Sequence, residues 1–65
     1  MIKIGSDRKD FVLLLQNALT LRGYPVEIDG VFGTGTRNAV IRFQTDFHLD
    51  VDGEVGPQTW KALFN

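Results

Sequence analysis

The 65-residue sequence contains no cysteine, a single histidine and no long apolar run. Without cysteine, neither a disulfide nor a thiolate zinc site can stabilise so small a domain. One histidine cannot supply the three or four protein ligands that zinc requires. No stretch reaches the roughly 18 apolar residues of a membrane span, and no apolar signal-peptide segment follows Met1. The 43% of residues that are hydrophobic must therefore form the core alone, and we expect no cofactor.

Charge of one sign is also scarce, because seven Lys and Arg face eight Asp and Glu for a net charge of −1. The basic residues are scattered, and no run is longer than Arg8-Lys9. A nucleic-acid or anionic-membrane surface needs clustered positive charge. The sequence therefore predicts neither nucleic acid nor membrane as a partner.

The feature that is present is an internal repeat. The stretch "IDGVFGTGTRNAV" at 28–40 returns 23 positions later as "VDGEVGPQTWKAL" at 51–63. Five pairs are identical: Asp29/Asp52, Gly30/Gly53, Gly33/Gly56, Thr36/Thr59 and Ala39/Ala62. Upstream, Leu15-Gln16 is matched by Phe43-Gln44. Each unit reads as a connector, an Asp-Gly turn and a helix, and two units packed on a first helix can cover each other's apolar faces.

Helical periodicity gives the fold class, an all-α domain of three helices with a pseudo-repeat. A stripe at Val12, Leu15, Ala18 and Leu19 predicts a helix at about 7–22, capped by Ser6 or Asp7 and stopped by Gly23. A second helix follows Gly33 and ends near Phe47, with Ala39, Val40, Phe43 and Phe47 on its apolar face. Gly56-Pro57 opens a third, with Trp60 and Leu63 facing inward. Residues 1–6 are assigned as a tail with at most one extended contact, and residues 7–65 as the domain.

The connectors are expected to be held by apolar anchors and turn chemistry. The anchors predicted for them are Ile28, Phe32, Leu49, Val51 and Val55. The predicted structural turn residues are Asp29, Gly30, Gly33, Asp52, Gly53 and Gly56, since Asp accepts amides of its own turn and Gly permits unusual backbone angles. Gln16 and Gln44, at equivalent positions, are expected to hydrogen-bond the connectors. The Thr36 and Thr59 hydroxyls can reach back toward their helix starts, and His48 is expected to end the second helix in a left-handed conformation.

Catalytic and metal interpretations find little support. Asp29 and Asp52 could be a glycosidase carboxylate pair, yet each has a complete explanation as a turn residue. "HLDVDGEV" resembles half of a calcium loop, but the first and twelfth positions, which should be acidic, are His48 and Thr59. No motif joins Ser6 to His48 in a triad. We therefore expect no catalytic residue and no metal.

Five residues are candidates for ligand binding. Tyr24 and Trp60 could stack on a sugar, although core packing is the alternative for Trp60. Arg37, Asn38 and Arg42 lie on or beside the polar face of the second helix, where guanidinium groups could take peptide carboxylates; the alternative is that they are simply solvated. Leu13, Leu14, Ile41 and Phe64 fall outside the apolar stripes, and if exposed they indicate contact with another domain.

The pattern as a whole is similar to the bacterial peptidoglycan-binding domain of the three-helix type. The resemblance covers 7–63 and rests on Val12, Leu15-Gln16, Leu19, Gly23-Tyr24, Ile28-Asp29-Gly30, Phe32-Gly33, Thr36, Ala39-Val40, Phe43-Gln44, Leu49, Asp52-Gly53, Val55-Gly56-Pro57, Thr59-Trp60 and Ala62-Leu63. Arg22 and His48 depart from the pattern, where leucine and glycine are usual.

The resemblance implies a non-catalytic, monomeric module that anchors a murein hydrolase to peptidoglycan at the bacterial cell wall or periplasm. The ligand is a glycan strand or a stem peptide, and the partner is a tethered catalytic domain. The lack of a signal peptide fits a phage endolysin or an excised domain. The competing hypothesis is a protein-interaction or inhibitory module, such as a protease pro-region.

Overall fold

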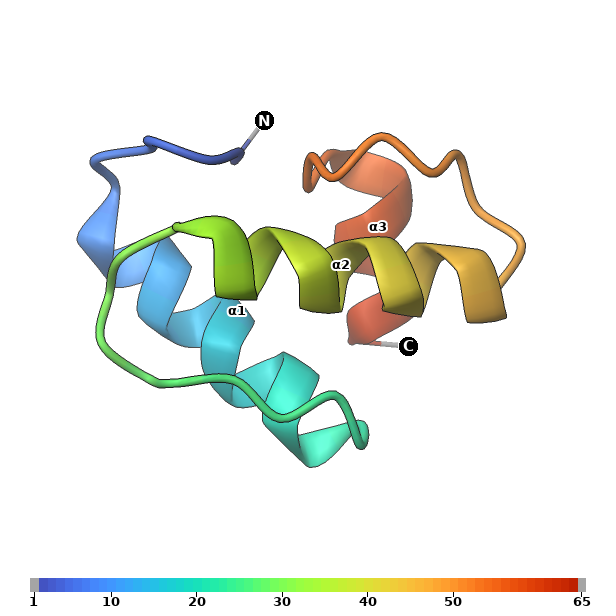
Figure 1. Cartoon of the computed structure of the whole chain (residues 1–65). Helices are drawn as coiled ribbons and strands as arrows, with labels where there is room; N and C mark the ends of the chain where they lie inside the picture. Colours follow the sequence, from blue (N-terminus) through green and yellow to red (C-terminus); the bar gives the residue numbers. More distant parts are fainter. Residues whose placement is uncertain (1, 65) are drawn as a thin grey trace.

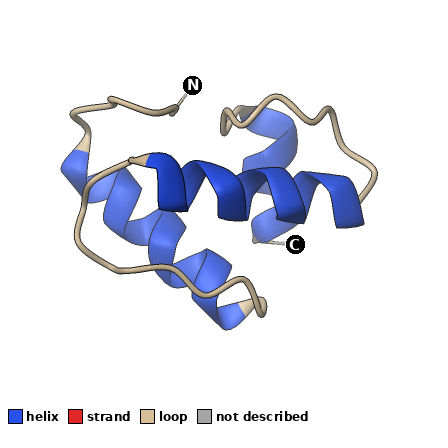
Figure 2. Cartoon of the chain, in the orientation of Figure 1, coloured by secondary structure: helices blue, strands red, loops and turns tan. Residues whose placement is uncertain are grey.

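Within the described part of the chain, a short N-terminal segment is followed by three helices joined by two long connectors. The computed structural model describes residues 2–64. Helix α1 spans Lys9–Leu21, α2 spans Thr34–Asp46 and α3 spans Pro57–Leu63. Residues 2–64 contain no strand, so the all-α fold class predicted from the sequence is confirmed (Figures 1 and 2).

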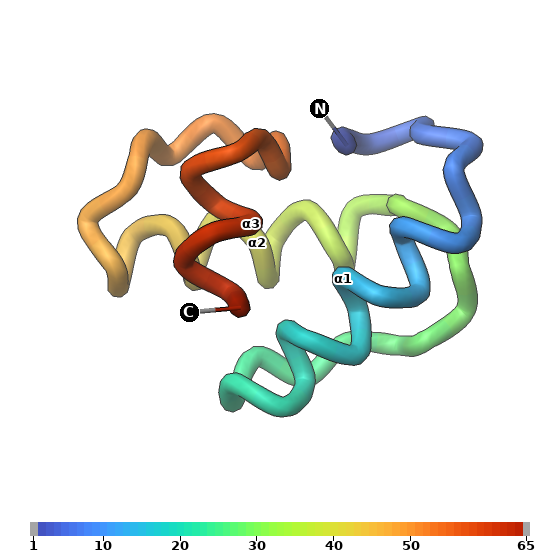
Figure 3. Tube along the Cα trace, turned by 180° about the vertical axis from the view of Figure 1, so that it is seen from behind, coloured from blue at the N-terminus to red at the C-terminus, as the bar shows by residue number. Residues whose placement is uncertain are grey.

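Helix α2 crosses the molecule, and α1 and α3 both lie on one side of it. Seen from behind, α1 and α3 stand in front of α2 with a space between their axes (Figure 3). The first connector runs from the end of α1 around the outside to the start of α2, and the second returns from α2 to α3 (Figure 1). In each repeat the connector therefore runs along the outside of the molecule before the next helix begins.

The second and third helices start where the sequence predicts. Gly33 and Gly56 are the residues before α2 and α3, and their backbone angles are nearly the same: φ −105°, ψ −163° for Gly33 and φ −103°, ψ −168° for Gly56. Pro57 occupies the first turn of α3, where its missing amide hydrogen costs nothing. His48 has φ 57° after the end of α2, which confirms its left-handed conformation.

The start of α1 differs from the prediction. The helix begins at Lys9, two residues late, and Arg8 precedes it without a side-chain capping bond. The expected cap at Ser6 or Asp7 is therefore wrong. The amide of Ser6 bonds the Lys3 carbonyl at 2.9 Å, and the amide of Lys9 bonds the Asp7 carbonyl at 3.0 Å. These bonds fold the preceding residues into turns of their own.

The core lies where the three helices meet the connectors. Its buried apolar members are Ile2, Val12, Leu15, Ala18, Leu19, Phe32, Ala39, Val40, Phe43, Val55 and Leu63. Phe32 and Val55 are thus confirmed as anchors, and Leu49 is partly buried against the core. Ile28 and Val51 are not anchors, because they are 47% and 52% exposed.

The first residues complete the core from outside the repeat. Ile2 pairs with Val55 in a short antiparallel bridge, with N···O distances of 3.1 and 2.7 Å. The amide of Gly5 bonds the Phe32 carbonyl at 3.0 Å. The N-terminal segment therefore bonds one residue of each connector and adds Ile2 to the core.

Candidate ligand-binding grooves

A buried glutamine holds the first Asp-Gly turn. The Gln16 side chain is fully buried, and its Oε1 accepts hydrogen bonds from the amides of Asp29 at 3.0 Å and Gly30 at 2.9 Å. Its Nε2 donates to Asp29 Oδ1 at 3.0 Å, the Val31 carbonyl at 3.1 Å and Thr36 Oγ1 at 3.1 Å. One carboxamide therefore ties α1 to the turn and to the first turn of α2.

The second repeat copies this arrangement. Gln44 Oε1 accepts from the amides of Asp52 at 3.2 Å and Gly53 at 3.0 Å. Gln44 Nε2 donates to Asp52 Oδ1 at 3.0 Å, the Glu54 carbonyl at 2.9 Å and Thr59 Oγ1 at 3.2 Å. The prediction that the two glutamines hydrogen-bond the connectors is confirmed, and the threonine hydroxyls are their partners.

Both turn aspartates are held as carboxylates. Asp29 Oδ1 accepts the Val31 amide at 2.9 Å, and Asp52 Oδ1 accepts the Glu54 amide at 2.9 Å. These bonds hold the pKa of each aspartate below its ordinary value of 3.8. The backbone amides have the largest effect, and the glutamine donors have the next largest. Oδ1 of each carboxylate accepts hydrogen bonds within its own turn, which supports the structural assignment of both aspartates.

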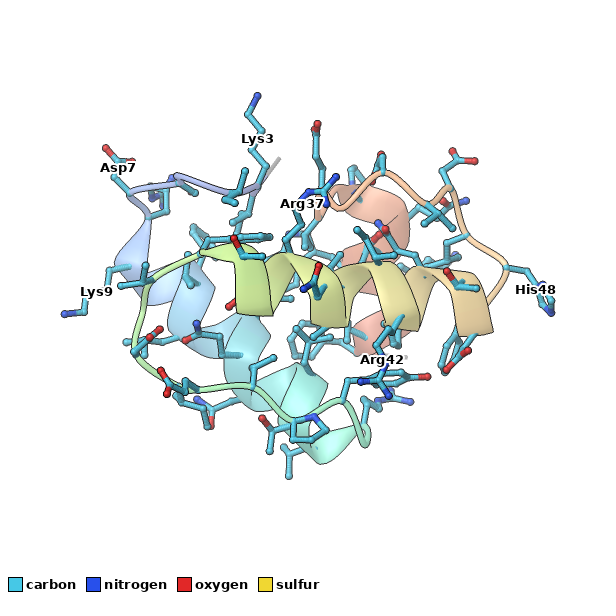
Figure 4. The ribbon with its side chains drawn as sticks, viewed as in Figure 1. Lys3, Asp7, Lys9, Arg37, Arg42 and His48 are labelled. Atoms are coloured by element: carbon cyan, nitrogen blue, oxygen red, sulfur yellow. The ribbon has the colours of Figure 1, made fainter. Side chains whose placement is uncertain are left out.

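A cationic side chain covers the glycine of each turn. Gly30 has φ +78°, and a Cβ there would lie 2.7 Å from Lys9 Cγ. Gly53 has φ +72°, and a Cβ there would lie 3.0 Å from Arg37 Nε. The aliphatic stem of Lys9 lies against the first turn, and Cγ, Nε and Cζ of Arg37 lie against the second. The Lys9 ammonium points away from the molecule (Figure 4).

Each connector forms a groove with the start of the helix that follows it. Groove 1 has a volume of about 230 Å³ and is lined by Pro25, Val26, Glu27, Asp29, Val31, Gly33, Gly35 and Thr36. Groove 2 has a volume of about 120 Å³ and is lined by Asp50, Asp52, Glu54, Gly56, Pro57, Gln58 and Thr59. Six lining positions of groove 1 recur in groove 2 exactly 23 residues later. The repeat therefore builds a concave surface at equivalent positions twice.

Two of the predicted ligand residues lie together at the far end of α2. The half-buried Tyr24 packs edge-on against Phe43, with ring centroids 5.5 Å apart, and donates its hydroxyl to Asp46 Oδ2 at 2.6 Å. This bond first, and desolvation second, raise the pKa of Tyr24 above 10.0, whereas the nearby Arg42 charge lowers it. Tyr24 and Arg42 therefore face a common patch with Asp46.

The other three candidates lie elsewhere. Arg37 and Arg42 project from opposite edges of α2 (Figure 4), and Asn38 is exposed on the same helix. Trp60 is partly buried and stacks on Phe64 with centroids 5.5 Å apart, while Phe11 meets it edge-on at 6.2 Å. The structure therefore does not bring the five candidates into one site.

The groove-lining residues were not predicted as ligand residues. One feature of the sequence could have indicated them, namely the unequal length of the connectors. Asp29 follows Gln16 by 13 positions, whereas Asp52 follows Gln44 by only eight. The longer first connector supplies Pro25 and Val26, which extend groove 1. The other feature is Gly35, a glycine in the first turn of a helix.

Residues 2–64 show neither a metal-ligand cluster nor a membrane-spanning helix. No group of three or more His, Cys, Asp or Glu within this part of the chain could hold a metal ion. None of its helices has the length and apolar character needed to cross a bilayer.

These features define a small three-helix domain with two turn-lined grooves. A family described as putative peptidoglycan binding domain matches residues 8–63, and the chain belongs to this family. The spore cortex-lytic enzyme of Bacillus cereus is 42% identical over 64 residues, which cover 97% of this chain and 24% of the enzyme. The N-acetylmuramoyl-L-alanine amidase CwlM of Mycobacterium tuberculosis is 39% identical over 56 residues, 85% of this chain and 14% of the enzyme.

Solved structures have the same fold. A peptidoglycan-binding protein from Clostridioides difficile superposes with a TM-score of 0.89 at 47% identity, over 95% of this chain and 39% of the other. The SleB N-terminal domain superposes with a TM-score of 0.88 at 42% identity, over 97% of this chain and 86% of the other. The chain covers only a small part of these two relatives, 24% of the spore cortex-lytic enzyme and 14% of the amidase.

Proposed function

We propose that this domain binds peptidoglycan reversibly and holds a cell-wall hydrolase on its insoluble substrate. The observation that carries the proposal is the family match over residues 8–63, together with two intact Gln–Asp–Gly turns. Binding raises the effective concentration of a tethered catalytic domain near its substrate. The domain itself contributes recognition of glycan or stem peptide and no chemistry.

The tethered partner follows from the relatives. A spore cortex-lytic enzyme and an amidase each contain a segment similar to this chain as a small part of their length. We infer that the domain acts as a monomer at the bacterial cell wall beside a hydrolase. A phage endolysin is the parent proposed from the sequence, whereas the names of these relatives support the wider class of cell-wall hydrolases.

Co-sedimentation with protein-free sacculi tests the proposal. We expect the purified domain to pellet with sacculi and to remain bound in moderate salt, because a net charge of −1 leaves little general electrostatic attraction. Sacculi of Gram-negative and Gram-positive bacteria should both be tested. If the domain pellets with neither, the wall-anchoring function is wrong and the interaction-module hypothesis takes its place.

The predicted ligand residues can be ranked in the same assay. Five variants each remove one polar group or replace a large ring with a smaller one: Tyr24→Phe, Arg37→Gln, Asn38→Ala, Arg42→Gln and Trp60→Phe. A residue that touches the ligand should weaken binding by about 1–3 kcal/mol, or roughly 5- to 150-fold. Lys61→Gln, an exposed charge on α3, is the matched control and should bind as the unsubstituted domain does.

One surface favours the competing proposal of a protein-interaction module. Phe11, Leu14 and Phe64 are 39%, 47% and 53% exposed, and Phe11 and Phe64 both contact Trp60. Leu14 and Phe64 thus meet the condition under which the sequence predicts contact with another domain, whereas Leu13 and Ile41 are only partly exposed. Polar substitution of Leu14 and Phe64 should leave sacculus binding unchanged if the face serves a tethered domain.

A further inference from the structure

Three of the six equivalent lining pairs differ in residue type, and the pair Gly35 and Gln58 differs most in side-chain size. A Cβ at Gly35 would meet no atom within 4 Å, so the space above it in groove 1 is open. In groove 2 the Gln58 side chain crosses the groove, and its Oε1 accepts a hydrogen bond from the Asp50 amide at 3.3 Å. The chain's own carboxamide thus occupies part of groove 2, which is the smaller of the two.

The donor that Gln58 engages has a counterpart in groove 1. Glu27 stands 23 residues before Asp50 and lines groove 1, as Asp50 lines groove 2. Among residues 2–64 the Glu27 amide has no hydrogen-bond partner. Equivalent glutamine bonds hold Asp29-Gly30 and Asp52-Gly53, and Gly33 and Gly56 have nearly equal backbone angles. The repeat therefore relates the Glu27 amide to the Asp50 amide.

We propose that groove 1 binds a neutral amide of the ligand, whose carbonyl oxygen takes the place that Gln58 Oε1 holds in groove 2. The Glu27 amide donates to that oxygen. Pro25, Val26 and Val31 line the groove and offer an apolar wall to a methyl or methylene group beside the carbonyl.

Charge selects a neutral amide over a carboxylate. Glu27 and Asp29 both line groove 1, and the pKa of Asp29 is held below its ordinary value, so the groove carries negative charge at neutral pH. Two like charges in one small site repel a third. Peptidoglycan carries neutral amides in the acetamido groups of its sugars and in its stem peptides. The inference therefore rests on the proposed function and names the group that is recognised.

Substitution of Gly35 tests the assignment. Gly35→Gln supplies groove 1 with the side chain that groove 2 already contains, so it should occupy the groove and weaken sacculus binding at least tenfold. Gly35→Ala adds only a Cβ that meets nothing, and it should bind as the unsubstituted domain does. Far-UV circular dichroism and thermal unfolding should show both variants folded, since Gln is accommodated at the equivalent position of α3.

The outcomes separate the two proposals. If the unsubstituted domain does not pellet with sacculi, the proposed function is wrong and the inference falls with it. If the domain pellets and folded Gly35→Gln pellets equally well, only the assignment of groove 1 is wrong. If Gly35→Ala loses binding as fully as Gly35→Gln does, filling of groove 1 by the Gln side chain does not explain the loss, and the assignment of groove 1 is wrong.

Two probes distinguish the source of the amide. Backbone amide resonances of the ¹⁵N-labelled domain can be followed by NMR during titration with glycan strands freed of peptide, and separately with free stem peptide. A shift of the Glu27 resonance with glycan strands identifies an acetamido group, and a shift with stem peptide identifies a peptide amide. The Asp50 resonance should stay in place, because Gln58 already engages that amide. No shift of Glu27 with either probe would overturn the proposal.

Discussion

At the scale of single residues, two buried carboxamides organise the molecule. A glutamine side chain is neutral and has both a donor and an acceptor group, so Gln16 can take the amides of Asp29 and Gly30 while donating to the Asp29 carboxylate. A carboxylate at this position would lack the donor, and an apolar side chain would satisfy neither group. Gln44 repeats the solution in the second unit.

Replacement of Gln16 should therefore be costly. We expect Gln16→Leu to lower the free energy of unfolding by about 3 kcal/mol or more, since it leaves the buried Gly30 amide and its neighbours unpaired. Urea unfolding followed by Trp60 fluorescence measures this loss. Asn17→Ala on the exposed face of α1 is the control and should change stability by less than about 0.5 kcal/mol. A loss below about 1 kcal/mol for Gln16→Leu would contradict the central role of this side chain.

The turn aspartates predict a particular acid response. The pKa values of Asp29 and Asp52 are lower in the folded domain than their ordinary 3.8, so the folded state binds fewer protons than the unfolded chain near that pH. The stability that the two carboxylates contribute is thus fully present above about pH 4–5 and is lost as the pH falls through their folded pKa values.

Asn substitution isolates this contribution. The Asp29→Asn/Asp52→Asn variant keeps an acceptor oxygen at each turn but cannot titrate there, so its stability should fall less steeply between pH 5 and 2.5. Urea midpoints measured across that range compare the variant with the unsubstituted domain. Equal slopes would show that other carboxyl groups carry the acid sensitivity.

At the scale of elements, each Asp-Gly turn is covered by a cation from the helix before it. The stems of Lys9 and Arg37 occupy the space where a Cβ on Gly30 or Gly53 would be. Both glycines have positive φ, a conformation that other residues adopt only at a cost. The glycines thus serve two purposes, a left-handed turn and close contact with a neighbouring side chain.

A double-mutant cycle separates these two effects. Gly30→Ala should destabilise the domain by about 1–2 kcal/mol through its left-handed conformation alone, with a further loss from contact with the Lys9 stem. Lys9→Ala removes the stem. The double variant should therefore keep the cost of the left-handed conformation but lose the cost of contact with the Lys9 stem. Unfolding free energies from far-UV circular dichroism give the coupling. Gly35→Ala is the control and should not destabilise the fold, because Gly35 has neither a positive φ nor an atom near its Cβ position. Strict additivity of Gly30→Ala and Lys9→Ala in the cycle would exclude the contact with Lys9.

At the scale of the whole molecule, a segment outside the repeat joins its two units. Ile2 is buried and pairs with Val55 of the second connector, while the Gly5 amide bonds Phe32 of the first. A domain of this size has few apolar residues to spare, so each buried side chain is a large share of its stability.

Truncation of this contact should be measurable in the intact chain. Ile2→Ala is expected to cost about 2 kcal/mol, because it removes buried methyl and methylene groups from the core. The exposed neighbour Lys3 provides the control, and Lys3→Ala should be nearly neutral. Both are compared by urea denaturation. An Ile2→Ala variant as stable as the control would place Ile2 outside the folding unit.

Much of this architecture is encoded locally. The helices follow from apolar spacing, the starts of α2 and α3 from Gly33 and Gly56-Pro57, and the turns from Asp-Gly pairs. Even the glutamine hydrogen bonds were predictable, because a polar residue that recurs on an apolar stripe must find partners. The start of α1 was less predictable, since turns at residues 3–9 compete with the caps that Ser6 and Asp7 offered.

The sequence by itself thus determined three helices, two equivalent turns and the family to which the chain belongs. Only the tertiary structure decided which connector side chains face outward, which helix faces meet and which groove stays open. The physical reason is that connectors lack periodicity. In each turn the glutamine takes two successive backbone amides, which turns the main chain toward the core and leaves Ile28 and Val51 exposed. That Gln58 occupies part of groove 2, where Gly35 leaves groove 1 open, likewise depends on a contact across the connector between residues eight positions apart.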